Sequence, residues 1–239
     1  MSGDPEQLSA DEKMRAVIIS QGRSGSTYLQ HLLDSHPDVT FQGELLSPGR
    51  LALNGQDPGM EGADAVGSYL ASRLGNDAAV VGFKMPWDWL LVYPEVWGFL
   101  RQMKFRLIFL RRRNKVDQHL SVKLAQLNDN WDSRSVYAEQ HLEIDPDELL
   151  RGWTIFNHID YLLERMCERF PMHAITWENL ASGQGHDGLC NFLDVEPRLL
   201  QSATIRSRSL PKREVIANFD ALLERFKEHP IGSQLNDGN

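Results

Sequence analysis

The sequence contains little cysteine. Two cysteines, Cys167 and Cys190, occur among 239 residues, which is too few for a disulfide framework or a cysteine-based metal cluster. The histidines show no spacing typical of metal ligands, so we expect no metal site. Cysteine usage of this kind is typical of proteins in a reducing compartment. The expected location is therefore cytoplasmic.

Long apolar runs are also missing. No stretch approaches the ~20 apolar residues that a membrane-spanning helix needs, so no transmembrane segment is expected. Residues 1–13 are polar and acidic, and they lack the pattern of a signal or transit peptide. We expect a disordered tail over residues 1–13 and a single α/β domain over 14–239, a length that suits one hydrophobic core.

Basic residues are fewer than acidic ones. The chain has 33 acidic residues against 25 Lys and Arg, and its formal net charge is −8. A protein that binds duplex nucleic acid normally needs a basic face to neutralise phosphates. The composition therefore disfavours nucleic acid as a partner.

Four short, apolar, β-branched runs predict buried strands, at residues 15–20, 78–84, 105–110 and 172–177. Amphipathic helical patterns lie between them. This alternation is typical of a mainly parallel sheet that helices cover on both faces. Residues 47–62 predict a long loop, a candidate lid over an acceptor site, and residues 214–226 predict a last helix. Ligands in such sheets bind at the carboxyl ends of the strands.

The first predicted strand runs into a turn of small residues, Gly22–Thr27, and then into a helical pattern. Backbone N–H groups at such a helix N-terminus converge on an anion. The turn differs from the phosphate loop of nucleotide triphosphatases, because only two residues separate its glycines and no Lys follows the second. No predicted strand ends in an acidic residue for Mg²⁺. The sequence argues against Mg·ATP, and a kinase-like phosphotransferase remains the alternative.

Two motifs resemble those of a known family. The segment Arg23–Thr27 (RSGST) resembles the 5′-phosphosulfate loop of sulfotransferases that use 3′-phosphoadenosine 5′-phosphosulfate. A second signature of these enzymes is an Arg after a strand, followed eight positions later by a Ser on the next helix. Arg113 and Ser121 match that spacing.

Three further segments narrow the resemblance to the bacterial branch that includes trehalose 2-sulfotransferase and related carbohydrate sulfotransferases. They are the triple arginine at 111–113, the Lys84–Asp88 segment (KMPWD) and the pair Gly43-Glu44. One family feature is absent, the Arg-Lys-Gly segment near the C-terminus of cytosolic sulfotransferases. The basic residues 205–213 (IRSRSLPKR) are a candidate replacement whose roles the sequence does not assign.

The resemblance implies a P-loop-like, three-layer α/β sandwich and a metal-free reaction. In that reaction a sulfuryl group passes in line from 3′-phosphoadenosine 5′-phosphosulfate to a hydroxyl of a carbohydrate or other small-molecule acceptor, leaving adenosine 3′,5′-bisphosphate. The resemblance also implies roles in binding the cofactor. Arg23 is expected to contact the phosphosulfate and the leaving oxygen, and Arg113 and Ser121 are expected to bind the 3′-phosphate. The 5′-phosphate is expected to bind the loop residues Ser24, Gly25, Ser26 and Thr27.

The same resemblance favours Glu44 as the general base that accepts the acceptor proton, with His36 as a rival base. Lys84 is expected to stabilise the sulfuryl oxygens or to hold the acceptor. Trp87, Asp88 and Trp89 are candidates for an acceptor pocket, although core packing also explains such tryptophans. A non-catalytic nucleotide-binding module is the third reading. The identity of the acceptor and a homodimeric state are not decided by the sequence.

Overall fold

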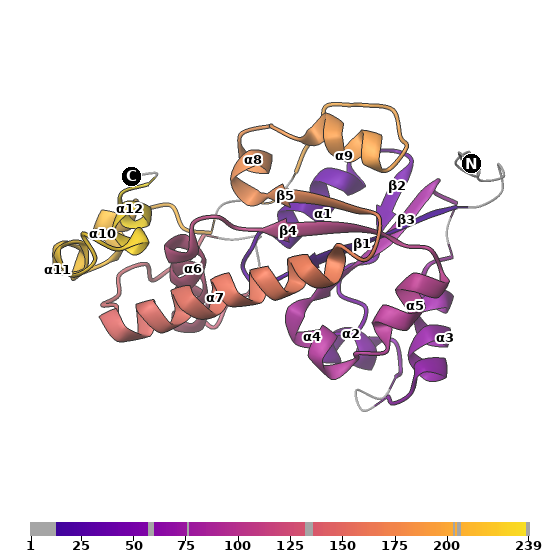
Figure 1. The fold of residues 1–239 in the computed structure, drawn as a ribbon, viewed down its shortest axis with the longest axis horizontal. Helices are drawn as coiled ribbons and strands as arrows, with labels where there is room; N and C mark the ends of the chain where they lie inside the picture. The colour runs from indigo at the N-terminus through magenta and orange to yellow at the C-terminus, as the bar shows by residue number, and fades with distance from the viewer. Residues whose placement is uncertain are drawn as a thin grey trace, which may run out of the picture.

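In the computed structural model, five parallel strands form one sheet in the order β2-β3-β1-β4-β5 (Figure 1). The structure describes residues 13–56, 60–75, 77–131, 136–202, 204 and 207–237. The predicted tail therefore lies outside these residues, apart from Lys13. The strands are β1 Met14–Ser20, β2 Val39–Phe41, β3 Val80–Pro86, β4 Arg106–Arg111 and β5 Met172–Thr176. The predicted α/β fold with a parallel sheet is confirmed.

Helices cover both faces of the sheet (Figure 1). One face carries α1, α8 and α9, and the other carries α2 to α5 and α7. The bounds of the helices on the two faces are α1 Ser26–Asp34, α2 Pro48–Leu53, α3 Ala63–Arg73, α4 Trp87–Val92, α5 Val96–Gln102, α7 Pro146–Cys167, α8 Trp177–Ala181 and α9 His186–Phe192.

Alternation along the strands explains the two layers, because successive side chains of a strand point to opposite faces. In β1, Val17 and Ile19 pack with α3, α5 and α7, whereas Ala16 and Ile18 pack with α1 and α9. All four side chains are fully buried. The near-continuous apolar runs seen in the sequence are therefore those of a sheet buried on both sides.

A third apolar cluster lies at one end of the molecule, where α6 (Lys115–Leu127) and α7 meet three short C-terminal helices (Figure 1). These are α10 Lys212–Val215, α11 Phe219–Arg225 and α12 Pro230–Asn236. This cluster sits next to the carboxyl ends of the strands, since α6 follows β4 directly. It places the C-terminal region beside the edge of the sheet where ligands are expected.

Two expectations about local structure were wrong. Residues 214–226 do not form one helix, because the backbone at Ala217 donates a hydrogen bond to Leu142 and the Asn218 amide bonds both backbone groups of Ile144. This distant pairing interrupts the helix. The predicted loop 47–62 contains α2, which starts at Pro48, a residue whose fixed φ suits the first helical position.

Candidate active site

A cavity of ≈ 730 Å³ opens at the carboxyl edge of the sheet. Segments that follow all five strands contribute to it, and so do residues after α6 and before α10. Its lining residues are Gln21, Gly22, Arg23, Gly25, Ser26, Thr27, Tyr28, Glu44, Pro86, Asp88, Trp89, Arg112, Asp117, Ser121, Trp131, Tyr137, Trp177, Ala181, Thr204, Ser207 and Arg208. The volume lies in the range of small-molecule and cofactor sites.

The loop between β1 and α1 forms the floor of this cavity. Arg23 and Gly25 both adopt positive φ, 59° and 96°, which turns the chain sharply into the helix. The Ser24 hydroxyl donates a hydrogen bond of 2.7 Å to the Gln21 carbonyl oxygen and closes the turn. Gly25 is the N-cap of α1 and has no side chain to occupy the helix N-terminus. The first-turn N–H groups are therefore left available for an anion.

Glycine is required at position 25 for two reasons. An L side chain rarely adopts its backbone conformation, and a Cβ there would lie 2.2 Å from Cδ1 of Trp177. Trp177 begins α8 directly after β5, so its ring reaches the loop from a strand that β4 separates from β1 in the sheet. The close approach fixes the loop against the opposite wall of the cavity.

Glu44, Lys84 and Thr27 meet on the β2–β3 side of the loop. The buried Lys84 ammonium donates to the Thr27 hydroxyl at 3.1 Å and lies 3.3 Å from Oε1 of Glu44. Gly43 has a φ of 75°, and its carbonyl accepts the Lys84 N–H at 2.8 Å. The chain thus turns at Gly43 so that Glu44 meets the end of β3. Its side chain is 37% exposed, which leaves the carboxylate accessible from the cavity.

Arg23 and Ser121 meet on the β4 side. The Arg23 Nε donates to the Ser121 hydroxyl at 3.0 Å. Its other two nitrogens donate to the Trp131 carbonyl at 3.0 Å and to the Tyr137 hydroxyl at 2.7 Å. The side chain therefore lies across the cavity toward α6 and the segment after it. The predicted loop arginine and the predicted 3′-phosphate serine are direct neighbours.

Two adjacent arginines after β4 take different directions. Arg112 lines the cavity, and its guanidinium lies over the Trp177 ring, 4.6 Å from the ring centroid. Arg113 does not line it. The Arg113 side chain is 65% exposed, with Nε 3.8 Å from Oε2 of Glu178. The Glu178 carboxylate also accepts the backbone N–H groups of Arg113 and Asn114, so it holds the start of α6 in place.

Asp117, which lines the cavity beside Arg112, is surrounded by three cationic side chains. Its carboxylate lies 3.5 Å from Arg112, 3.0 Å from Arg208 and 3.8 Å from Lys212. Lys212 is fully buried, and burial lowers the pKa of its ammonium while Asp117 opposes that shift. The sequence left the role of the basic residues 205–213 open. In the structure Arg208 from this segment lines the cavity, whereas Lys212 is fully buried and does not line it.

His36, the rival base, lies elsewhere. Its ring is buried, Nδ1 accepts the Asp38 N–H at 3.1 Å, and Nε2 lies 3.0 Å from the Glu196 carbonyl oxygen. It does not line the cavity. Both ring nitrogens already have backbone partners, which is the pattern of a structural histidine.

Among the cavity residues that had no role assigned from the sequence are Arg112, Asp117, Tyr137 and Arg208. The two arginines stand in conspicuously basic runs, 111–115 and 205–213, which is the signal that could have marked them. Nothing local distinguishes Asp117 or Tyr137. They reach the site only because α6 and the segment after it fold over the loop.

Within the described part of the chain, no cluster of three or more His, Cys, Asp or Glu side chains could hold a metal ion. Among the same residues, no helix combines the length and the apolar character that crossing a bilayer requires.

Comparison with known proteins identifies the fold. No protein-family model and no curated protein matches the chain. Among solved structures, a sulfotransferase from Alicyclobacillus acidocaldarius matches with a TM-score of 0.52 at 16% identity, over 92% of this chain and 98% of that one. The chain therefore has the α/β fold of a sulfotransferase.

Two more structures match less well. The sulfotransferase domain of the curacin biosynthetic pathway gives a TM-score of 0.48 at 17% identity, over 95% of this chain and 96% of that one. The mouse sulfotransferase SULT7A1, solved in complex with PAP, gives 0.47 at 13% identity, over 96% and 90%.

Proposed function

We propose that this protein is a sulfotransferase, which transfers a sulfuryl group from 3′-phosphoadenosine 5′-phosphosulfate to a hydroxyl of a carbohydrate or other small molecule. One observation carries the proposal. On one side of the anion-binding loop at the start of α1, the buried Lys84 touches Glu44, and on the other side Arg23 of the loop itself touches Ser121 on α6. Two cationic sites on either side of one loop suit a donor with two separate anionic groups.

The donors around the cavity suit such a nucleotide. The helix N-terminus, the hydroxyls of Ser26 and Thr27, and Lys84 would hold the 5′ end. Ser121 and an arginine after β4 would hold the 3′-phosphate. The family spacing assigns that arginine role to Arg113, whereas the lining of the cavity supports Arg112. The donor, when bound, supplies the sulfuryl group and a phosphate leaving group.

Catalysis by this chain would rest on positioning and on charge. Glu44 is accessible from the cavity and would accept the proton of the acceptor hydroxyl. The Lys84 ammonium, 3.3 Å from that carboxylate and 3.1 Å from Thr27, would stabilise negative charge that develops between acceptor and donor. Arg23 would stabilise the negative charge on the leaving oxygen. To do so, its guanidinium would exchange its present contacts with Ser121, Trp131 and Tyr137 for phosphate oxygens.

The acceptor would enter on the β2–β3 side. Glu44 and Asp88, which follow these two strands, line the cavity there together with Trp89, whereas Arg112 and Arg208 line the β4 side. An aromatic face beside carboxylates suits a sugar, whose hydroxyls donate hydrogen bonds while its C–H face stacks on the ring. With the Gly43-Glu44 pair, this supports placement in the trehalose 2-sulfotransferase-like branch.

The kinase-like alternative is less well supported. It needs a carboxylate that can hold Mg²⁺ beside the phosphates, and Asp117, on the β4 side, is already in contact with Arg112, Arg208 and Lys212. Thermal-shift titrations separate the two readings. Adenosine 3′,5′-bisphosphate should raise Tm in proportion to the logarithm of its concentration, and Mg·ATP should not. A shift with Mg·ATP alone would overturn the proposal.

The variant Glu44→Gln tests the enzymatic role. It keeps the size and hydrogen-bonding capacity of the side chain but removes its basicity, so sulfuryl transfer to a panel of sugars should fall about 10²–10⁴-fold. Affinity for adenosine 3′,5′-bisphosphate should stay within about twofold, because Glu44 lies on the acceptor side. Glu95→Gln is the control, because Glu95 does not line this cavity. Unchanged turnover in Glu44→Gln would remove Glu44 from the mechanism.

A further inference from the structure

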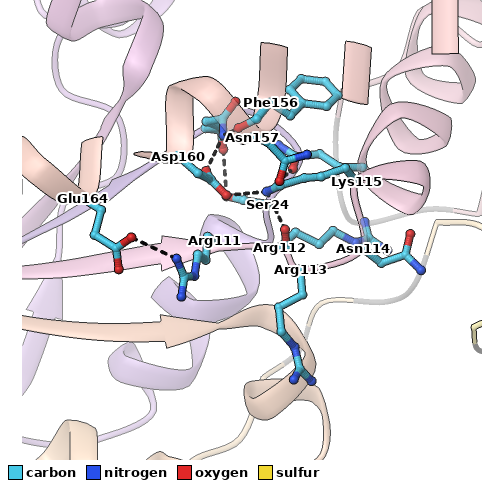
Figure 2. A network of polar contacts seen from close by, with 12 residues as sticks. Ser24, Arg111, Arg112, Arg113, Asn114, Lys115, Phe156, Asn157, Asp160 and Glu164 are labelled. Atoms are coloured by element: carbon cyan, nitrogen blue, oxygen red, sulfur yellow. Dashed lines mark hydrogen bonds and ion pairs between the residues drawn. The ribbon is translucent and has the colours of Figure 1, made fainter. Parts of the chain in front are cut away.

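A ring of buried polar side chains contacts the anion-binding loop, and Figure 2 shows the part of it around Asp160 and Lys115. Asp160, on the inner face of α7, accepts hydrogen bonds from Gln21 through Oδ1 and from Lys115 through Oδ2. Lys115 also donates to Gln118 at 3.2 Å, and the Gln118 amide donates to the Gly22 carbonyl at 2.9 Å. Gln21 and Gly22 are adjacent in the loop, so the ring closes.

The ring also reaches the residues that follow β4. The Lys115 ammonium donates to the Arg112 carbonyl oxygen (Figure 2). Gln21 additionally donates to the Phe156 carbonyl at 2.8 Å, one turn before Asp160 on α7. The Lys115 ammonium thus has hydrogen-bond partners on α7, on α6 and at Arg112, directly after β4.

The four side chains of the ring, those of Gln21, Lys115, Gln118 and Asp160, are buried. The side chains of Lys115 and Asp160 are 3% and 8% exposed, and Gln118 is completely buried. Burial lowers the pKa of the Lys115 ammonium, and the charge of Asp160 opposes that shift. A buried ion pair is a weak source of stability, because desolvation offsets the attraction. A fully hydrogen-bonded one, however, allows a single arrangement of its partners.

The ring joins the two halves of the proposed donor site. Gln21 and Gly22 belong to the loop proposed for the 5′ end, whereas Arg112 and the first turn of α6 lead to Ser121, proposed for the 3′-phosphate. None of the ring atoms needs to touch the nucleotide. What the ring sets is the spacing between two anion sites that lie on different strands of the sheet.

We propose that Asp160 is a positioning residue, which fixes the distance between the 5′ and 3′ anion sites through Lys115 and thereby selects nucleotides that carry both groups. This inference rests on the proposed function. Once one phosphate of a rigid nucleotide is bound, the second binds at an effective concentration set by how well the sites match its spacing. Loosening the ring lowers that effective concentration and leaves each single phosphate contact intact.

Binding of three nucleotides tests this role by calorimetry: adenosine 3′,5′-bisphosphate, adenosine 5′-phosphate and adenosine 3′-phosphate. In Asp160→Asn, affinity for the bisphosphate should fall by about tenfold or more, whereas affinities for the two monophosphates should change less than about threefold. Glu164→Gln is the matched control, since Glu164 lies one turn further along α7 and pairs with Arg111 at 3.1 Å outside the cavity. It should bind all three like the wild type.

A second variant guards against loss of folding in Asp160→Asn. Gln118→Leu removes the link to Gly22 and one hydrogen bond of Lys115 but leaves the Lys115–Asp160 pair in place, and it should show the same selective loss for the bisphosphate. An equal loss for all three nucleotides, or none, would overturn the positioning role. Failure of the wild type to bind adenosine 3′,5′-bisphosphate would overturn the proposed function as well, so the two failures are distinguishable.

Discussion

The contact between Gly25 and Trp177 gives the sharpest prediction about the loop. In Gly25→Ala the new methyl group meets two obstacles. The backbone holds a φ of 96°, where L residues are strained, and the ideal Cβ lies 2.2 Å from Cδ1 and 3.0 Å from Nε1 of Trp177. A real Cβ does not approach a ring atom so closely, so the loop or the indole has to move.

The expected cost follows from these two obstacles. A left-handed conformation costs an L residue about 1–2 kcal/mol, and forcing an extra methyl into a packed contact adds about 1–3 kcal/mol. The sum is roughly 2–5 kcal/mol, which corresponds to a fall in Tm of roughly 4–20 °C for a chain of this size. If the loop moves to relieve the clash, its N–H groups no longer converge on the anion. The affinity for the nucleotide then falls instead of the stability.

Gly22→Ala is the matched control, because Gly22 lies in the same loop, has no positive φ and has no atom within 4 Å of its ideal Cβ. Urea unfolding and calorimetric binding of adenosine 3′,5′-bisphosphate should be measured for both variants. Gly25→Ala should lose stability, affinity or both, and Gly22→Ala should lose neither. If the two variants behave alike, the packing of Trp177 on the loop is not what the structure indicates.

Two further predictions concern other residues. Arg112→Ala should weaken binding of adenosine 3′,5′-bisphosphate more than Arg113→Ala, because Arg112 lines the cavity whereas Arg113 is mostly exposed; the reverse order in calorimetry would restore the assignment made from motif spacing. Burial lowers the pKa of His119 below its ordinary value of 6.5, so the unfolded chain binds this proton more readily and stability falls as pH decreases below that value. In His119→Leu, the dependence of the unfolding free energy on pH between about pH 7 and 5 should be shallower, and an unchanged slope would contradict the argument.

The main elements of the fold could be predicted because their signals are local. Apolar runs bounded by turns marked the strands. Caps are equally local: at the start of α7 the Asp145 side chain accepts the N–H of Glu148, three positions along, at 2.7 Å. The small-residue turn at 22–27 marked an anion site, since a strand, glycines and a helix start suffice to form one. These features depend on neighbours in the chain.

The composition of the site depended instead on contacts between distant segments. Motif spacing cannot tell which of two adjacent arginines faces a cavity, and here the contact of Arg112 with Trp177 decides it. Nor can it show that Arg208 and Asp117, 91 positions apart, form an ion pair. The sequence by itself determined an α/β sheet with an anion-binding loop after its first strand. The tertiary structure decided which charges surround that loop, because their partners lie on other strands and helices and meet only when the chain is folded.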